Sequence, residues 1–320
     1  MKPIPDDLLG CAFTRAEAAH HGVTSRMLEG SRFTRVYPGV WRATNTLLTH
    51  RQLIAAAALA LPDQAHLTGI TRLQMLGLDY GPRSPLRFVV EGDLHLDLDG
   101  IFLHRTKRLA PHDIHGITPV GAFLSYCSLA RAIDAIKVGD WLLYEGHATR
   151  QEILDLASSA LWRAGAAEAV WVLDHLHTDS RSLKESETRA VLEFSGLEAP
   201  EVNVVLPLAS EGDVIGDLFF RRWRTVVEYE GSHHQTERGQ YRSDLDRYAR
   251  LRAESISYVQ VTHEKLATPR LVVSEVFRTL VANGYDGPPP QLNDHWRSLF
   301  ARIGRTLGSR RDYLRRLAAS

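Results

Sequence analysis

Acidic residues in the C-terminal half of the chain have the types and spacing of a metal site. Residues 217–231 have the pattern of two short strands joined by a basic turn, with Asp217 in the first strand. Side chains alternate between the faces of a strand, so Glu228 and Glu230 in the second strand share one face. A hairpin would bring Asp217 opposite them. Carboxylate oxygens are preferred ligands of Mg²⁺ and Mn²⁺, and such an ion activates water and stabilises charge on a phosphodiester.

The alternative is that these acids form the solvated face of an exposed strand, which is the ordinary role of a Glu-x-Glu pair. Two features favour a site. Val226 and Val227 are expected to be buried, and His233 and His234 follow the strand directly after a glycine and a serine. A histidine pair at this point is also compatible with a polar strand end that leads into a loop.

The elements around the acids follow a regular order. We expect helices at residues 182–194, 244–253 and 274–282, and strands at residues 202–206, 214–220, 225–230 and 257–261. Helix, three strands, helix, strand, helix is typical of an α/β sandwich with a mixed sheet. Residues 177–182 are the predicted linker that precedes it.

A second compact unit is expected at residues 13–43. Thr14 and Glu17 have the spacing of a capping box, which starts a helix that ends near Gly22. A second short helix and two strands around the Pro38–Gly39 turn complete the layout of a winged helix-turn-helix. Positive charge on this unit comes from Arg42 and from three arginines that we expect to contact DNA: Arg26, Arg32 and Arg35. The alternative is a structural cap that binds no nucleic acid.

The segment between these two units is less informative. We expect helices at residues 50–61, 68–78, 122–134, 135–144, 149–164 and 166–175, and strands at residues 87–91 and 101–105. The whole chain is therefore predicted to have a mixed α/β (α+β) fold.

Composition and charge narrow the classes of function. The 320 residues carry no net charge, with 44% hydrophobic and 24% charged residues, as in an ordinary globular protein. Cys11 and Cys127 are too few for a disulfide framework. No apolar run approaches the length of about 20 residues that spans a bilayer, and the N-terminus has no apolar signal core. We expect a cytoplasmic protein without a membrane partner.

Positive charge is concentrated in two places. Residues 297–320 contain seven arginines and one acid, and the turn of the hairpin carries Arg221, Arg222 and Arg224. Such patches bind phosphate backbones. The tail is equally compatible with an amphipathic helix docked on its own protein, with four apolar residues inward: Leu299, Phe300, Ile303 and Leu307.

Four motifs carry a resemblance to a known family: Glu187-Thr188-Arg189, Ile215–Leu218, Val227–His234, and Asp244-x-x-Arg247 followed by Leu251. In order and spacing, over about 100 residues, they resemble the very-short-patch-repair-like branch of the PD-(D/E)XK nuclease superfamily. The resemblance implies a metal-dependent DNA endonuclease that uses Mg²⁺ or Mn²⁺.

The resemblance also implies roles for single residues. Asp217 would be the central metal ligand, Glu228 and Glu230 the second acidic motif, and Glu187 the acid on the first helix. His233 or His234 would act on the water or the phosphate, and Asp244 and Arg247 would support the site. The superfamily often has a lysine where Glu230 stands, and a carboxylate does not replace the ammonium that orients water.

The N-terminal part is similar to a second family. Phe13–Ala18, Val36–Trp41 and the region to about residue 160 resemble abortive-infection antitoxin (AbiEi-like) regulators. These have a winged-helix head and a mixed α/β middle domain, so the resemblance implies DNA binding by the head.

Together these patterns predict four parts: a winged-helix head at residues 1–48, an AbiEi-like middle domain at residues 49–178, a PD-(D/E)XK-like domain at residues 179–285 and a basic helical tail at residues 286–320. The leading hypothesis is a metal-dependent endonuclease acting on DNA. The alternative is a DNA-binding regulator or antitoxin-type protein whose nuclease-like domain is inactive. RNA remains a further option as the substrate, because the phosphodiester chemistry is the same.

Overall fold

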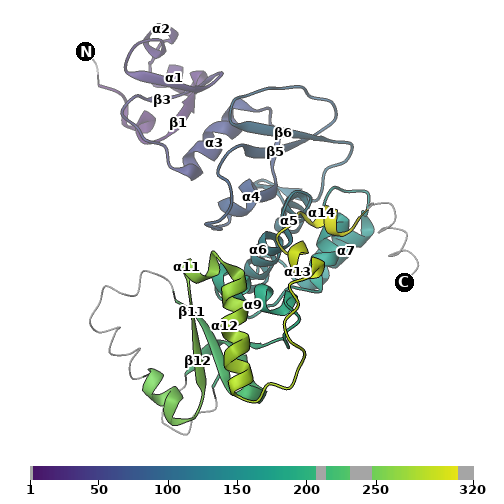
Figure 1. Cartoon of the computed structure of the whole chain (residues 1–320). Helices are drawn as coiled ribbons and strands as arrows, with labels where there is room; N and C mark the ends of the chain where they lie inside the picture. The colour runs from purple at the N-terminus through teal and green to yellow at the C-terminus, as the bar shows by residue number, and fades with distance from the viewer. Residues whose placement is uncertain (1–2, 207–213, 231–246, 309–320) are drawn as a thin grey trace. The chain divides into compact units, whose positions relative to one another are not determined.

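The structure is a computed structural model that describes residues 3–206, 214–230 and 247–308 (Figure 1). Helices and several sheets, two of them with both parallel and antiparallel pairs, confirm the mixed α/β class. Two compact units divide the chain, residues 1–123 and residues 124–320. The predicted boundaries at residues 48, 178 and 285 are finer than this division and stay predictions. Within the described ranges, no helix is long and apolar enough to cross a membrane.

The first unit opens with the expected helix-turn-helix and hairpin. After a 3-10 turn, its elements are β1 (Ala12–Thr14), α1 (Arg15–His20), α2 (Ser25–Leu28), β2 (Phe33–Tyr37) and β3 (Val40–Ala43). The three strands form a sheet in the order β1-β3-β2. Thr14 and Glu17 form the predicted capping box at the start of α1. The α2 helix has a single turn, and Gly39 takes the positive φ that the turn of the hairpin needs.

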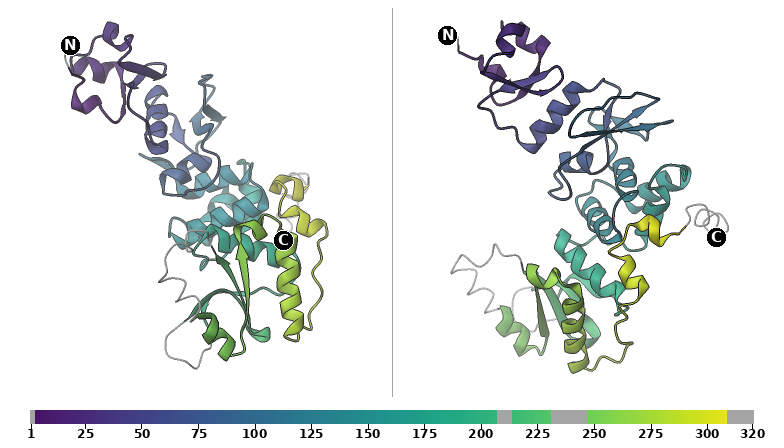
Figure 2. Two further views of the ribbon diagram at one scale, coloured as in Figure 1. Left: turned by 60° about the vertical axis from the view of Figure 1, so that its left-hand side comes forward. Right: turned by 45° about the horizontal axis from the view of Figure 1, so that its top comes forward.

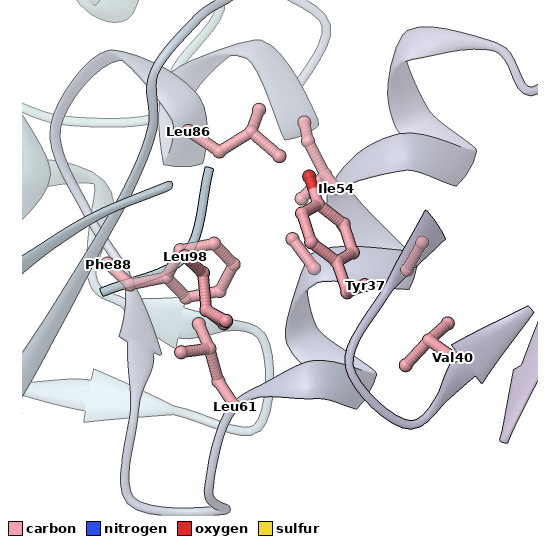
Figure 3. Packing of buried hydrophobic residues seen from close by; sticks show 9 residues of the cluster. Tyr37, Val40, Ile54, Leu61, Leu86, Phe88 and Leu98 are labelled. Carbon is pink, nitrogen blue, oxygen red and sulfur yellow. The ribbon is translucent and has the colours of Figure 1, made fainter. Parts of the chain in front are cut away.

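The remainder of this unit adds α3 (His50–Ala60), β4 (His66–Leu67), α4 (Gly69–Met75), β5 (Leu86–Glu91), β6 (Ile101–Thr106), β7 (His112–Asp113) and β8 (Gly116–Ile117). Strands β5 and β6 pair in parallel. One apolar cluster joins the hairpin to α3 and β5, as Tyr37, Ile54 and Phe88 show in Figure 3. The hairpin therefore shares a core with the segment that follows it.

Helices begin the second unit. They are α5 (Pro119–Cys127), which starts before the division, α6 (Ala132–Tyr144), α7 (Arg150–Ser159), α8 (Ala166–Leu173) and α9 (Leu183–Phe194). The prediction of helices at residues 122–134 and 135–144 placed the break too late. The backbone at this break pairs with the C-terminal segment instead of continuing a helix: Ala132 donates to the carbonyl of Ala301, and Ile303 donates to that of Ala130.

A four-stranded sheet follows, in the order β12-β11-β10-β9. Its strands are β9 (Glu201–Val205), β10 (Ile215–Phe220), β11 (Thr225–Glu230) and β12 (Ser257–Thr262). Only the β11–β12 pair is parallel. After β12 come α11 (His263–Leu266) and α12 (Pro269–Ala282), which lies alongside β11 and β12 in Figures 1 and 2. Helix α12 begins before residue 274 because Pro269 suits the first turn of a helix.

Both faces of this sheet are covered. On one face, Leu251 of the helical residues 247–253 packs against Phe219 and Val226. Their neighbours Leu218 and Val227 point the opposite way and are also fully buried. Polar side chains on these strands are thus held in a packed environment, where an unpaired charge is costly.

The C-terminal segment forms two short helices, α13 (Asp294–Ser298) and α14 (Ile303–Thr306), rather than one amphipathic helix. Leu299 and Ile303 are fully buried, and Leu307 is buried as well. The described part of the tail therefore docks through its apolar residues, as one of the two interpretations expected. Residues 309–320 lie outside the described ranges.

Candidate metal and nucleic-acid site

A row of polar residues crosses the sheet of the second unit. The pairing of Leu218 with Val227, continued by one residue, places Asp217 opposite Glu228. Glu228 pairs in turn with Gln260 on β12. On the other side, the β9–β10 register places Asn203 opposite Asp217. One position from each strand therefore contributes to the row, and the predicted facing of Asp217 and Glu228 agrees with the register.

Asp217 lies in an unfavourable environment for a charged group. Burial and the nearby charge of Glu185 raise the pKa of Asp217 from 3.8 to about 6. The backbone N–H of Tyr229, which donates to Asp217 Oδ2 at 2.9 Å, opposes this shift, as do Arg247 and Arg181. The ionised carboxylate is thus only partly compensated by the protein.

Glu185 was not among the predicted site residues. It lies in the first turn of α9, where its backbone N–H donates to the N-cap Ser182. Its Oε2 accepts hydrogen bonds from the backbone N–H of Arg181 at 2.9 Å and from Asn203 Nδ2 at 2.7 Å. These bonds tie the start of α9 to β9 and bring a second acid near Asp217. The Ser-x-x-Glu spacing predicts the first helical turn but not the strand that it meets.

Glu187 was the predicted helix acid, and in the structure its side chain contacts two lysines. Its Oε2 accepts hydrogen bonds from Lys137 Nζ at 2.8 Å and from Lys184 Nζ at 2.9 Å. Burial alone would raise its pKa, but the two lysines outweigh burial and lower the pKa of Glu187. Its charge is therefore compensated by cations, unlike that of Asp217, and its predicted role at the metal stays a prediction.

Glu228 is buried and paired. The guanidinium of Arg247 donates to the Glu228 carboxylate and to the carbonyl of Ile215. A charge-assisted bond of this kind fixes the orientation of a carboxylate. The contact agrees with the predicted supporting position of Arg247 beside the acids.

Glu230 is held by neutral donors. Its carboxylate accepts hydrogen bonds from the hydroxyls of Tyr248 and Tyr258 and from the side-chain amide of Gln260. Burial would raise the pKa of Glu230, but these three bonds and the charge of Arg247 lower it. Burial and the bond to Glu230 raise the pKa of Tyr258, so its hydroxyl stays a donor.

Among the residues that the structure describes, no group of three histidine, cysteine, aspartate or glutamate side chains could hold a metal ion. Glu230 contacts tyrosines and an amide rather than the other two acids, so a site formed by Asp217, Glu228 and Glu230 together stays a prediction. His233, His234 and Asp244 lie outside the described residues.

The arginines at the turn of the hairpin have partners. Arg221 forms an ion pair with Glu201, and Arg222 forms one with Asp286. Arg224, in the left-handed region at φ +42°, donates to the carbonyl of Glu254. Arg221 and Arg222 are more than half exposed, so their charges are near the surface although paired. Phosphate binding by this cluster would compete with these contacts.

The arginines predicted to face DNA in the first unit are at its surface. Arg26 on α2 and Arg35 on β2 are exposed, and Arg32 lies over the ring of Phe33 at 6.0 Å. Arg35 Nε donates to the carbonyl of Tyr37 at 3.4 Å.

Comparisons of the chain with protein-family models, with curated proteins and with solved structures found no match.

Proposed function

We propose that the protein is a metal-dependent endonuclease that acts on DNA in the cytoplasm. The observation that carries this proposal is the partly compensated carboxylate of Asp217, whose pKa is raised to about 6, opposite Glu228 in the sheet. A buried acid with a raised pKa costs stability, and such costs are concentrated at functional sites. A divalent cation would remove the cost.

Asp217 and Glu228 fit a hard cation, because both offer carboxylate oxygens and the charge of Asp217 lacks a full partner. Mg²⁺ or Mn²⁺ bound there would supply a more acidic water and stabilise charge on the phosphate. Arg247 would orient the carboxylate of Glu228 by donating a hydrogen bond to it. Glu185 would add a negative charge next to Asp217. Arginines at the surface of the head and of the hairpin would bind the DNA backbone.

The test is cleavage of supercoiled plasmid DNA with Mg²⁺ or Mn²⁺. Asp217→Asn and Glu228→Gln keep the shape of each side chain and remove its charge, and each should reduce the cleavage rate at least about 100-fold. The control Asp294→Asn removes one acid from the exposed surface of the tail and should cleave as the wild type does. Equal cleavage by all four proteins would contradict the assignment.

A second candidate is a DNA-binding regulator whose nuclease-like domain is inactive. The hydrogen bonds from Tyr248, Tyr258 and Gln260 to Glu230 favour it, because they occupy the carboxylate at the position where the superfamily often has a lysine. Calorimetric titration with Mg²⁺ and Mn²⁺ separates the two candidates. Binding that is lost in Asp217→Asn supports the endonuclease; sequence-selective DNA binding with no metal binding supports the regulator.

A further inference from the structure

A cavity of about 640 Å³ lies at the β12 edge of the sheet in the second unit. Its walls come from the helical residues 247–253, from β12 and the two residues that precede it, and from Asn283, which directly follows α12. Small-molecule sites in proteins have volumes of about 300–1,000 Å³. The cavity is therefore large enough for a nucleobase with its sugar.

The cavity belongs to the same face of the sheet as the acids. Gln260, which lines it, is the register partner of Glu228 and the last member of the polar row that contains Asp217. Neighbouring strands are about 4.8 Å apart, so Gln260 lies about 10 Å from Asp217 across two strand intervals. Glu230, two residues after Glu228 on β11, accepts hydrogen bonds from three residues of the cavity wall: Tyr248, Tyr258 and Gln260.

The lining has the chemistry of a nucleotide site. The rings of Tyr248 and Tyr258 lie 4.5 Å apart, and their bonds to Glu230 hold them in place. Aromatic faces of this kind stack with bases, and a glutamine amide hydrogen-bonds base edges. Arg252 is exposed at the rim and has no ion pair within the described part of the chain. A guanidinium in that position binds phosphate.

We propose that this cavity binds an unstacked nucleobase of the DNA strand whose backbone lies at Asp217 and Glu228. The proposal rests on the proposed function, since it takes the strand to be held at those acids. Stacked nucleotides advance about 3.4 Å along a strand, so a span of about 10 Å reaches a base close to the bound phosphate. One of the two tilted rings, Tyr248 or Tyr258, stacks with the base through its outer face. Gln260 meets the edge of the base, and Arg252 binds the adjoining phosphate.

The experiment titrates the full chain with each of the four deoxynucleoside 5′-monophosphates in EDTA, with deoxyribose 5-phosphate as the baseless comparison. Base stacking should make the monophosphates bind at least about 10-fold more tightly than deoxyribose 5-phosphate. Arg252→Gln should weaken binding of the monophosphates about 10-fold through loss of the phosphate contact. Arg278→Gln removes an exposed arginine of α12 that does not line the cavity, and should bind as the wild type does.

Three results would overturn the proposal: no binding of any monophosphate, equal binding of deoxyribose 5-phosphate, or equal weakening by Arg252→Gln and Arg278→Gln. EDTA separates this test from the cleavage test. Plasmid cleavage without monophosphate binding would refute the cavity and keep the endonuclease. Monophosphate binding that depends on Arg252, without cleavage under any metal, would keep the cavity as a DNA contact and refute the endonuclease.

Discussion

Replacing Asp217 by asparagine should stabilise the protein in the absence of metal. The folded-state pKa of Asp217 is about 6, against 3.8 for the ordinary group. The folded-state pKa is raised, so the protonated carboxyl of Asp217 contributes to the stability of the folded protein. This contribution is fully present below pH 3.8 and is lost as the pH rises through about 6. At pH 8 the ionised carboxyl of the wild type therefore carries the whole cost.

The shift of about two pKa units corresponds to about 3 kcal/mol at pH 8, since one unit is worth about 1.36 kcal/mol. Asparagine keeps an oxygen that accepts the N–H of Tyr229 and carries no charge, so it avoids this cost. At pH 5 the gain in stability from Asp217→Asn should fall to roughly half. Most of the wild-type carboxyl is then protonated in the folded protein and avoids the cost of a buried charge.

The assay is urea unfolding of the wild type and the variant in EDTA at pH 5 and pH 8. Glu228→Gln is the matched control in the same row of the sheet. It removes the charge that pairs with Arg247, so it should destabilise the protein by about 2 kcal/mol instead. A variant Asp217→Asn that is no more stable than the wild type at pH 8, or whose gain is the same at both pH values, would refute the reasoning.

Three further predictions concern the surroundings of the site. Asp140→Asn should destabilise the protein by about 2 kcal/mol in urea unfolding, because the buried guanidinium of Arg189 loses the carboxylate at 2.9 Å and keeps its ion pair with Glu193. Glu185→Gln should lower the pKa of Asp217, measured by carboxyl NMR titration, since it removes the neighbouring negative charge; an unchanged pKa would contradict the coupling. Gly165→Ala should prevent stable folding, seen as loss of a cooperative thermal transition, because the added Cβ would lie 1.7 Å from a backbone carbonyl oxygen and the backbone has φ +85°.

Several elements could be predicted because their cause is local. The capping box of Thr14 and Glu17 sets the start of α1 within one turn of chain. Alternation of apolar and acidic residues predicts the strand Thr225–Glu230, which the structure contains with the same bounds. The hairpin that joins it to β10 follows from the turn between them, so the facing of Asp217 and Glu228 was also within reach of the sequence.

Contacts between segments that are distant in the chain could not be predicted from the sequence. The break between α5 and α6 depends on backbone bonds to residues near 300, and no local signal marks it. Glu185 and Glu187 are two residues apart on one helix, and local pattern treats them alike. Their directions differ by about 200° around the helix axis, so one contacts Asn203 and the other Lys137.

The amino-acid sequence by itself determined the mixed α/β class, the strand that carries two acids and the hairpin that places Asp217 opposite one of them, because periodicity and turn chemistry act over a few residues. The tertiary structure decided which acid is left with a partly compensated charge. Lysines reach Glu187, an arginine reaches Glu228, and tyrosines reach Glu230, whereas Asp217 is buried beside another acid. Burial and charge depend on what packs around a residue, and only the folded chain brings those groups together.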